Sequence, residues 1–284
     1  MKFDNVLTRM LGVKYPIIQG AFGPKGMGTS SIAVPVAEAG GLGILTSISY
    51  AEPDEFQQDI REVKKRTEKP FAVNFTLFKD RNMLDEYHEE YVKVALKEGV
   101  PTVFTSAYDG SGIGRRFKAE GCNWIHKCAT IEHALSTAGK GVDAIVIVGL
   151  EGTGFKSPLQ HSTLINMTTT RRLTDVPLIA AGGIGDARGF VSALAMGAVG
   201  IYLGTAIMAT KEFQASDTIK NMIVKQDILD AEHRRKIYQM EHGGGHSLAA
   251  NLVDSIPTVK EFIDTIITEA EEIITEFKEW GMLD

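Results

Sequence analysis

Cysteine is scarce in this chain. Its 284 residues include two cysteines, Cys122 and Cys128, which do not form a CxxC pair. A chain of this size with two cysteines has no disulfide framework to hold it together. We interpret Cys128 as a buried, inert thiol at the end of a strand.

Long apolar runs are also missing. No window approaches 18 uninterrupted apolar residues, and the first residues, MKFDN, lack the apolar core of a signal peptide. We therefore expect a soluble, cytoplasmic protein that does not act at a membrane.

No strongly basic stripe occurs, and the formal net charge is -6. This charge distribution gives no electrostatic footprint for nucleic acid. The basic run at 64–66 shares its predicted helix with several acidic residues, which is typical of a solvated helix face.

Short apolar or β-branched runs recur along the chain, and each is followed by a helical pattern. Their spacing of roughly 20 to 35 residues suits a strand, a crossover helix and two short loops. Strands that alternate with helices favour a parallel sheet, and eight such units without a break favour a closed barrel. The sequence therefore predicts a single (β/α)₈ TIM-barrel domain over residues 1–284. The predicted strands are 16–20, 42–47, 71–75, 102–106, 124–128, 144–148, 177–181 and 199–203.

Helix-capping signals agree with this count. Thr130 and Asp186 are suitable N-caps for helices that run to Ala138 and Met196. After the eighth strand, residues 211–256 are long for a loop and contain three consecutive glycines at 243–245. We interpret this stretch as a lid-like excursion over the barrel mouth, followed by an amphipathic terminal helix over 259–278.

Glycines follow the last two predicted strands. Gly182 and Gly183 come directly after the seventh strand, and Gly204 and Thr205 follow the eighth. Barrels often bind a phosphate between these two loops, where backbone N–H groups must be reached without meeting a Cβ. The pattern predicts a phosphate site, with turn geometry alone as the alternative explanation for the glycines.

Several stretches together resemble the nitronate monooxygenase family, formerly called 2-nitropropane dioxygenases, and the related flavin-dependent enoyl-ACP reductases. The matching stretches are PIIQGAFG at 16–23, GGLGIL at 40–45, AVNF at 72–75, HKCATIEHAL at 126–135, GVDAIV at 141–146, PLIAAGGIGDARGFVSALAMGAVGIYLGT at 177–205 and IPTVKEFID at 256–264. The resemblance runs nearly from end to end, and the stretch from 177 to 205 is the most specific.

This resemblance implies that the chain binds flavin mononucleotide (FMN). It implies that the backbone of Gln19, Gly20 and Ala21 lies against the isoalloxazine ring and that Asn74 binds the polar edge of the ring. Lys127 would stabilise negative charge on the reduced flavin. The phosphate would bind at Gly182, Gly183, Gly204 and Thr205.

The loop after the sixth predicted strand departs from the family pattern at the Gln position, which is Val148, and at the His position, which is Phe155. After the sixth strand the family usually reads Gln-Gly-x-Glu-Ala-Gly-Gly-His, whereas this chain reads VGLEGTGF at 148–155. Glu151 is kept, but the histidine position is Phe155, and phenylalanine neither takes nor gives a proton. Glu151 either accepts a hydrogen bond from ribityl or substrate hydroxyls, acts as a base, or shapes the loop by accepting hydrogen bonds from backbone N–H groups.

Other histidines are candidates for the missing one. His161 follows in a polar loop, and His246 follows the triglycine run, with His242 nearby. We interpret His126 as a core histidine on a strand, directed into the barrel, and His88 and His133 as solvent-facing residues on helices. We find no His, Cys, Asp and Glu cluster with metal-ligand spacing and predict no structural metal.

The leading hypothesis is therefore an FMN-dependent oxidoreductase that oxidises alkyl nitronates with oxygen. A second hypothesis is a reductase in which NAD(P)H reduces FMN and a quinone or an enoyl thioester accepts the hydride. A third is a flavin-binding barrel without redox turnover, and a fourth is a flavin-free lyase or isomerase that uses the phosphate site. The expected partner is a small-molecule substrate, and self-association stays open.

Overall fold

A computed structural model describes residues 3–23, 26–77, 81–157, 159–239, 242–243 and 245–282. Eight parallel strands follow one another in the order β1-β9-β8-β6-β5-β4-β3-β2, and a bridge between Ile18 and Leu42 brings the two ends of this sheet together. The predicted TIM barrel is thereby confirmed. The strands are β1 (Ile17–Gln19), β2 (Gly43–Thr46), β3 (Phe71–Thr76), β4 (Thr102–Ser106), β5 (Asn123–Cys128), β6 (Ala144–Val148), β8 (Leu178–Ala181) and β9 (Gly200–Leu203).

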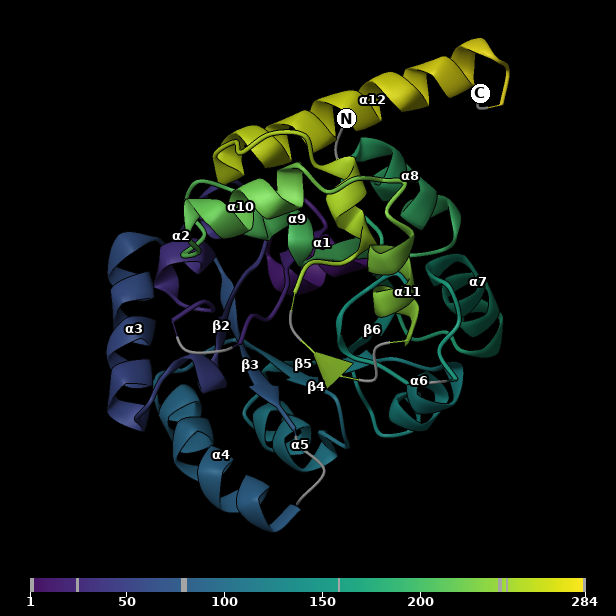
Figure 1. The fold of residues 1–284 in the computed structure, drawn as a ribbon. Coiled ribbons are helices and arrows are strands. Elements are labelled where there is room, and N and C mark those ends of the chain that lie inside the picture. The colour runs from purple at the N-terminus through teal and green to yellow at the C-terminus, as the bar shows by residue number, and fades with distance from the viewer. Residues whose placement is uncertain are drawn as a thin grey trace.

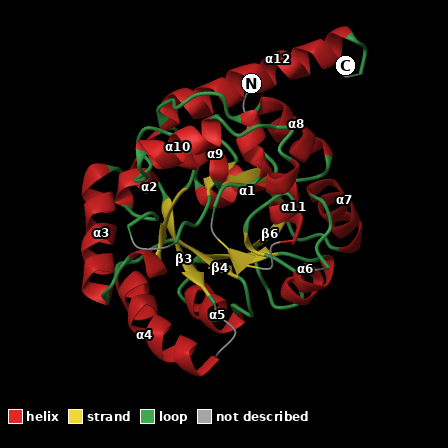
Figure 2. Cartoon of the chain, in the orientation of Figure 1, coloured by secondary structure: helices red, strands yellow, loops and turns green. Residues whose placement is uncertain are grey.

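Helices surround the strands, as Figures 1 and 2 show. All eight predicted strands are present, and the caps at Thr130 and Asp186 accept hydrogen bonds from His133 N and Gly189 N. The helices between strands are α2 (Ser30–Glu38), α3 (Pro53–Arg66), α4 (Arg81–Lys97), α5 (Ser111–Ala119), α6 (Ile131–Ala138), α7 (Thr163–Leu173) and α8 (Ala187–Ala195), with a short 3-10 helix η1 (Ser47–Ser49) after β2.

Strand residues alternate between two cores. One set, which includes Ile18, Phe104 and Ile125, fills the interior of the barrel. The other set, which includes Val103 and Trp124, packs against the surrounding helices. Successive side chains of a strand point to opposite faces, so both faces of this parallel sheet are buried.

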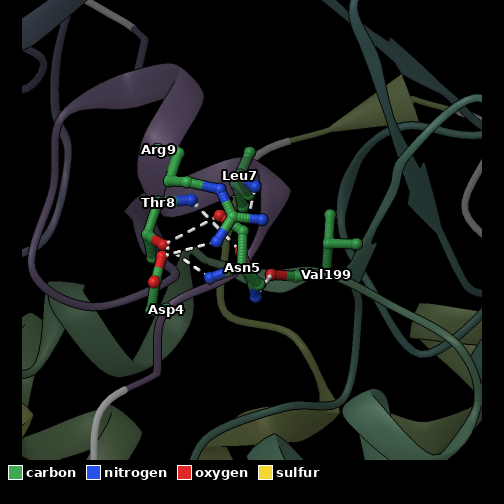
Figure 3. Close-up of polar contacts among 6 residues, drawn as sticks. All are labelled: Asp4, Asn5, Leu7, Thr8, Arg9 and Val199. Atoms are coloured by element: carbon green, nitrogen blue, oxygen red, sulfur yellow. Dashed lines mark hydrogen bonds and ion pairs between the residues drawn. The ribbon is translucent and has the colours of Figure 1, made fainter.

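A short helix that the sequence analysis did not predict, α1 (Val6–Leu11), adds Leu7 and Leu11 to the interior core. Asn5 is its N-cap, and the Asn5 carboxamide accepts hydrogen bonds from the backbone of Leu7 and Thr8. The Asn5 Nδ2 also donates to the Val199 carbonyl at 2.8 Å, just before β9 (Figure 3). This side chain therefore fixes α1 to the N-terminal end of the barrel.

The stretch 211–256 contains elements of its own. A short helix α9 (Thr205–Met208) precedes it, and it comprises α10 (Asp217–Val224), α11 (Ala231–Gln239), β10 (His242–Gly243) and a 3-10 helix η2 (Leu248–Leu252). Strand β10 pairs antiparallel with β7 (Gly154–Phe155), which belongs to the loop that leaves β6 at the C-terminal end of the barrel. In Figure 1 the yellow-green arrow of β10 overlies the barrel strands. The excursion is thus joined to the mouth, while its role as a lid stays a prediction.

The buried Lys156 holds this excursion from the other side. Its Nζ donates to the Leu150 carbonyl at 2.6 Å and to the Ile237 carbonyl of α11. The chain then ends in α12 (Val259–Glu279), which begins with a capping box at Thr258 and Glu261 and packs on α8 and α2. Within the described residues, no helix combines the length and apolar character that crossing a membrane requires.

Candidate functional site

Polar side chains gather where β3, β4, β5 and β9 end. Alternation with the interior-facing residues Ala72, Phe104 and Ile125 turns the last polar residues of these strands toward the barrel interior. Strand register places Thr76 opposite Ser106 and Ser106 opposite Lys127. We call Asn74, Thr76, Ser106, Lys127 and Tyr202 the polar arc. The C-terminal face is where TIM-barrel enzymes carry their active sites, so the arc is the first candidate.

Asn74 carries an unsatisfied acceptor. Its side chain is 1% exposed, and its Nδ2 donates to the Thr76 Oγ1 at 3.0 Å, but its Oδ1 has no hydrogen-bond partner. Thr46 is directly opposite in the register with β2, and its buried Oγ1 is also unpartnered. An unpaired buried polar group costs about 1–3 kcal/mol. Two such groups side by side suit a ligand with a polar edge.

Lys127 supplies positive charge to the arc. Its side chain is partly buried, its Nζ lies 5.8 Å from the centre of the Tyr202 ring, and no hydrogen-bond acceptor holds it within the described residues. Burial lowers the pKa of Lys127 from 10.5 to about 8, because a poorly solvated site disfavours the ammonium form. The lysine is therefore charged at neutral pH and is able to bind an anion.

The end of β1 closes the seam of the barrel. The Gln19 side chain is fully buried, and it exchanges hydrogen bonds with the backbone N–H and carbonyl of Ile44 on β2. The Ala21 N–H donates to the Tyr202 hydroxyl at 2.5 Å. At Gly20 an added Cβ would lie 2.9 Å from the Leu203 carbonyl oxygen. The contact of these residues with a flavin ring stays a prediction. Their visible role is to join the end of β1 to the neighbouring strands β2 and β9.

The glycines after β8 and β9 play two different parts. At Gly182 and Gly183, both with positive φ, an added Cβ would meet the loop at 149–152 within about 3 Å, so tight packing already requires glycine there. At Gly204 an added Cβ would meet no atom within 4 Å. The amides of Gly183 and Gly204 donate to no acceptor in the described part of the chain. This open space with free N–H groups fits a phosphate.

Thr205 is less available than the sequence suggested. Its buried Oγ1 lies 2.9 Å from the Ser247 Oγ and accepts a hydrogen bond from the Ser247 N–H at 2.8 Å. These bonds attach the excursion to the end of β9. Binding of a phosphate by the Thr205 hydroxyl stays a prediction.

Phe155 lies at the mouth. It packs against the interior core of the barrel, and its ring meets that of Tyr108 edge-to-face with centroids 5.2 Å apart. The neighbouring Ala107 has a φ of 78°, the sole positive φ at a non-glycine position among the described residues. Such a conformation carries strain and is common near functional sites. Phe155 thus forms part of an apolar wall at the mouth.

Glu151 shapes its loop. Its Oε2 accepts hydrogen bonds from the Thr163 N–H at 2.9 Å and the Thr163 hydroxyl at 3.0 Å, and its backbone carbonyl accepts from the Leu248 N–H. These contacts match the alternative in which this carboxylate organises the loop. A catalytic role for Glu151 stays a prediction.

The candidate histidines are engaged or exposed. The His161 side chain is exposed, and the His246 Nε2 lies 2.8 Å from the Gln226 Oε1 while its ring stacks on His233. The His242 side chain lies outside the described residues. These contacts orient the His246 ring toward α11 and the turn that follows α10, so the geometry gives neither His161 nor His246 a contact with the polar arc.

Three histidines differ from expectation. His88 is 2% exposed, so its solvent-facing assignment is wrong. His133 is partly buried, and its Nε2 lies 3.1 Å from that of His126, which lies outside the barrel between β5 and α6. Because β5 alternates, Ile125 faces inward and His126 faces the helices. The expectation that no cluster has metal-ligand spacing also fails, since His126, Cys128 and His133 converge.

Thr46, Thr76, Ser106, Tyr108 and Tyr202 were missed in the sequence. Four of them share one signal, because each is a polar residue within the last two positions of a parallel barrel strand. Tyr108 gave no such signal, because the backbone turn at Ala107 determines its direction.

Known proteins are similar to this chain in sequence. The family model of nitronate monooxygenase matches residues 4–257. A (3aS,4S,5R,7aS)-5-hydroxy-7a-methyl-1-oxo-octahydro-1H-indene-4-carboxyl-CoA dehydrogenase of Rhodococcus jostii is 30% identical over 89% of this chain and 67% of its own length. A probable nitronate monooxygenase of Staphylococcus saprophyticus is 28% identical over 78% of this chain and 73% of its own length.

A solved structure is similar over nearly the whole chain. FabK from Thermotoga maritima has a TM-score of 0.84 and 29% identity, over 96% of this chain and 98% of that one. The family model covers well over half of the residues, and the solved structure has the same barrel fold over nearly the whole chain. The chain therefore belongs to the nitronate monooxygenase family of flavin-type oxidoreductases.

Proposed function

We propose that this protein is an FMN-dependent oxidoreductase that oxidises an anionic alkyl nitronate with oxygen. The observation that carries the proposal is the Lys127 ammonium at a mouth whose histidine position is the apolar Phe155. Oxidation of a neutral nitroalkane requires a base to remove the α-proton. A nitronate arrives deprotonated, and it requires a cation instead.

The residues of the mouth fit FMN. The open space at Gly204 and the free amides of Gly183 and Gly204 would hold the phosphate. The unpaired Asn74 Oδ1 would accept a hydrogen bond from the polar edge of the ring. When bound, FMN supplies the electron-accepting group that this oxidation needs, and the protein supplies binding and orientation.

Lys127 would bind the nitro group of the substrate, and the apolar wall would enclose its alkyl group. The Lys127 Nζ would donate to the negatively charged nitro oxygens and orient the substrate over the arc. A Cβ added at Gly154 would lie 3.6 Å from this Nζ, so the lysine reaches the loop that carries Phe155. Phe155 and Tyr108 would exclude water from the alkyl side of the substrate, which strengthens the charge interaction with Lys127.

A second function is supported by the comparisons. The Rhodococcus relative is named for a carboxyl-CoA substrate, and FabK is among the similar solved structures. We therefore keep an NAD(P)H-dependent reductase or dehydrogenase of an acyl thioester as the alternative. In that reaction Lys127 would hold the thioester carbonyl oxygen, where negative charge develops as hydride is added.

The absorbance spectrum of the purified protein is the first test. A flavin spectrum, with FMN identified in the released cofactor by mass, supports the proposal, and a colourless protein that cannot be loaded with FMN refutes it. Oxygen uptake with a preformed nitronate then separates the two reactions. Nitronate turnover without bleaching by NADH or NADPH supports nitronate oxidation. Rapid anaerobic bleaching by either nucleotide, with reoxidation by an enoyl-CoA, supports the alternative.

A further inference from the structure

Two histidines and a cysteine meet on the outward side of β5, away from the polar arc. Strand alternation places His126 and Cys128 on the same face of β5, directed at the covering helices. Helix α6 returns over this face and brings His133 to the pair. The Nε2 atoms of His126 and His133 are 3.1 Å apart, and ligand atoms of all three residues lie within 4.8 Å of one another.

We propose that His126, Cys128 and His133 form a structural zinc site. Imidazole nitrogen and thiolate sulfur are the ligands that Zn²⁺ prefers, and they disfavour Mg²⁺ and Ca²⁺. Zinc–nitrogen bonds of about 2.0–2.1 Å in a tetrahedral site separate two nitrogens by roughly 3.3 Å, close to the distance seen here. The Cys128 Sγ lies within 4.8 Å of a ring nitrogen of each histidine, and water at the partly exposed His133 would complete the coordination.

The surroundings already hold the ligands in place. The His126 Nδ1 lies 2.7 Å from the Thr105 Oγ1, so the Nε2 is the nitrogen left to bind a metal. Thr105 is held in turn by the Trp124 Nε1, which donates to its Oγ1 at 2.8 Å. Metal-bound histidines characteristically donate their other nitrogen to such a partner. His133 is fixed through its backbone, because its N–H donates to the Thr130 cap at 3.2 Å.

The burial of its side chains distinguishes this cluster from an adventitious surface site. His126 is 1% exposed and Cys128 is fully buried. Surface histidines that bind metal adventitiously lack such enclosure. Because Lys127 lies between two of the proposed ligands, a zinc ion would also hold the backbone that carries this lysine. The proposal does not depend on the identity of the substrate or of the flavin.

Metal binding to the intact flavoprotein tests the site. The protein is stripped with a chelator and titrated with Zn²⁺ in competition with a chromogenic chelator, and Co²⁺ is then used as a spectroscopic probe. We expect one tight equivalent per chain. We also expect the red absorption bands of tetrahedral cobalt, which lie beyond oxidised flavin, and a thiolate-to-cobalt charge-transfer band.

Matched variants separate this site from others. Cys128→Ser should abolish the charge-transfer band, and His133→Gln should weaken zinc binding at least tenfold, whereas Cys122→Ser and His161→Gln should leave both unchanged. Thr105→Val should lower the affinity by roughly 10- to 100-fold through loss of the supporting hydrogen bond. Circular dichroism establishes which variants fold. If Cys128→Ser does not fold, His133→Gln, at a partly exposed residue, tests the site instead.

Three results would overturn the proposal. The first is absence of stoichiometric zinc binding by the wild-type protein. The second is equal binding by the Cys128 and Cys122 variants. The third is weak zinc binding that depends on exposed histidines instead of these three residues, which would show adventitious binding only.

Discussion

The charge state of Lys127 gives the sharpest test of the candidate site. Burial lowers its pKa to about 8, so the free enzyme is mostly in the ammonium form at pH 7. As pH rises through 8, the ammonium deprotonates and its attraction for an anionic substrate disappears. Since kcat/KM reports ionisations of the free enzyme, we expect it to fall about tenfold per pH unit above 8.

The size of the effect follows from the bond that is lost. A hydrogen bond to a charged group contributes about 1.5–3 kcal/mol, which corresponds to roughly 10- to 150-fold in kcat/KM. Lys127→Met should lose this factor at pH 7 and show no fall above pH 8. Lys127→Arg should keep the charge across the range, because an arginine does not deprotonate there.

Initial rates of oxygen uptake with a preformed nitronate, measured from pH 6.5 to 10, provide the assay. The flavin content of each variant is measured first, so that loss of cofactor is not mistaken for loss of substrate binding. A wild-type profile that stays flat to pH 10 would refute the reasoning. So would a methionine variant that retains the wild-type rate at pH 7.

Three further predictions follow from the fold and the mouth. Phe155→His should allow turnover of neutral nitroalkane, raised by up to about 10²-fold over wild type because a base becomes available, and unchanged rates would show that this position no longer governs the chemistry. Gly204→Ala should leave the melting temperature unchanged, since its Cβ enters open space, but should weaken FMN retention as measured by fluorescence of released flavin. Wild-type retention would mean that the phosphate lies elsewhere. Asn5→Ala should lower the free energy of unfolding by about 1–2 kcal/mol in urea denaturation, through loss of the α1 cap, whereas Asp4→Ala, at an exposed ion pair, should cost under 1 kcal/mol.

The barrel was predictable because it is built from a short sequence pattern that repeats along the chain. Each strand is a short apolar run followed by a helical pattern, and eight repeats of that unit leave few alternatives to a closed parallel barrel. Caps such as Thr130 and Asp186 mark helix starts through side chains that bond to amides three residues away. The glycines after β8 and β9 predict a phosphate site from an equally local pattern.

Side-chain direction was decided by tertiary structure. His126 faces the helices because β5 alternates from an interior Ile125, and the sequence does not show which alternate set faces inward when both faces are apolar. For the same reason the unpaired Asn74 Oδ1 became visible only when β2 and β3 were placed in register.

Contacts between distant segments were decided there as well. The sequence marked Glu151 and His246 as candidates because of their residue types and their neighbours. The fold showed that Thr163 holds the carboxylate and Gln226 holds the imidazole. The sequence by itself determined the barrel and the family, because those depend on local patterns. Which polar groups are free to meet a ligand was decided by long-range packing, because a hydrogen-bond partner far along the chain is invisible until the chain folds.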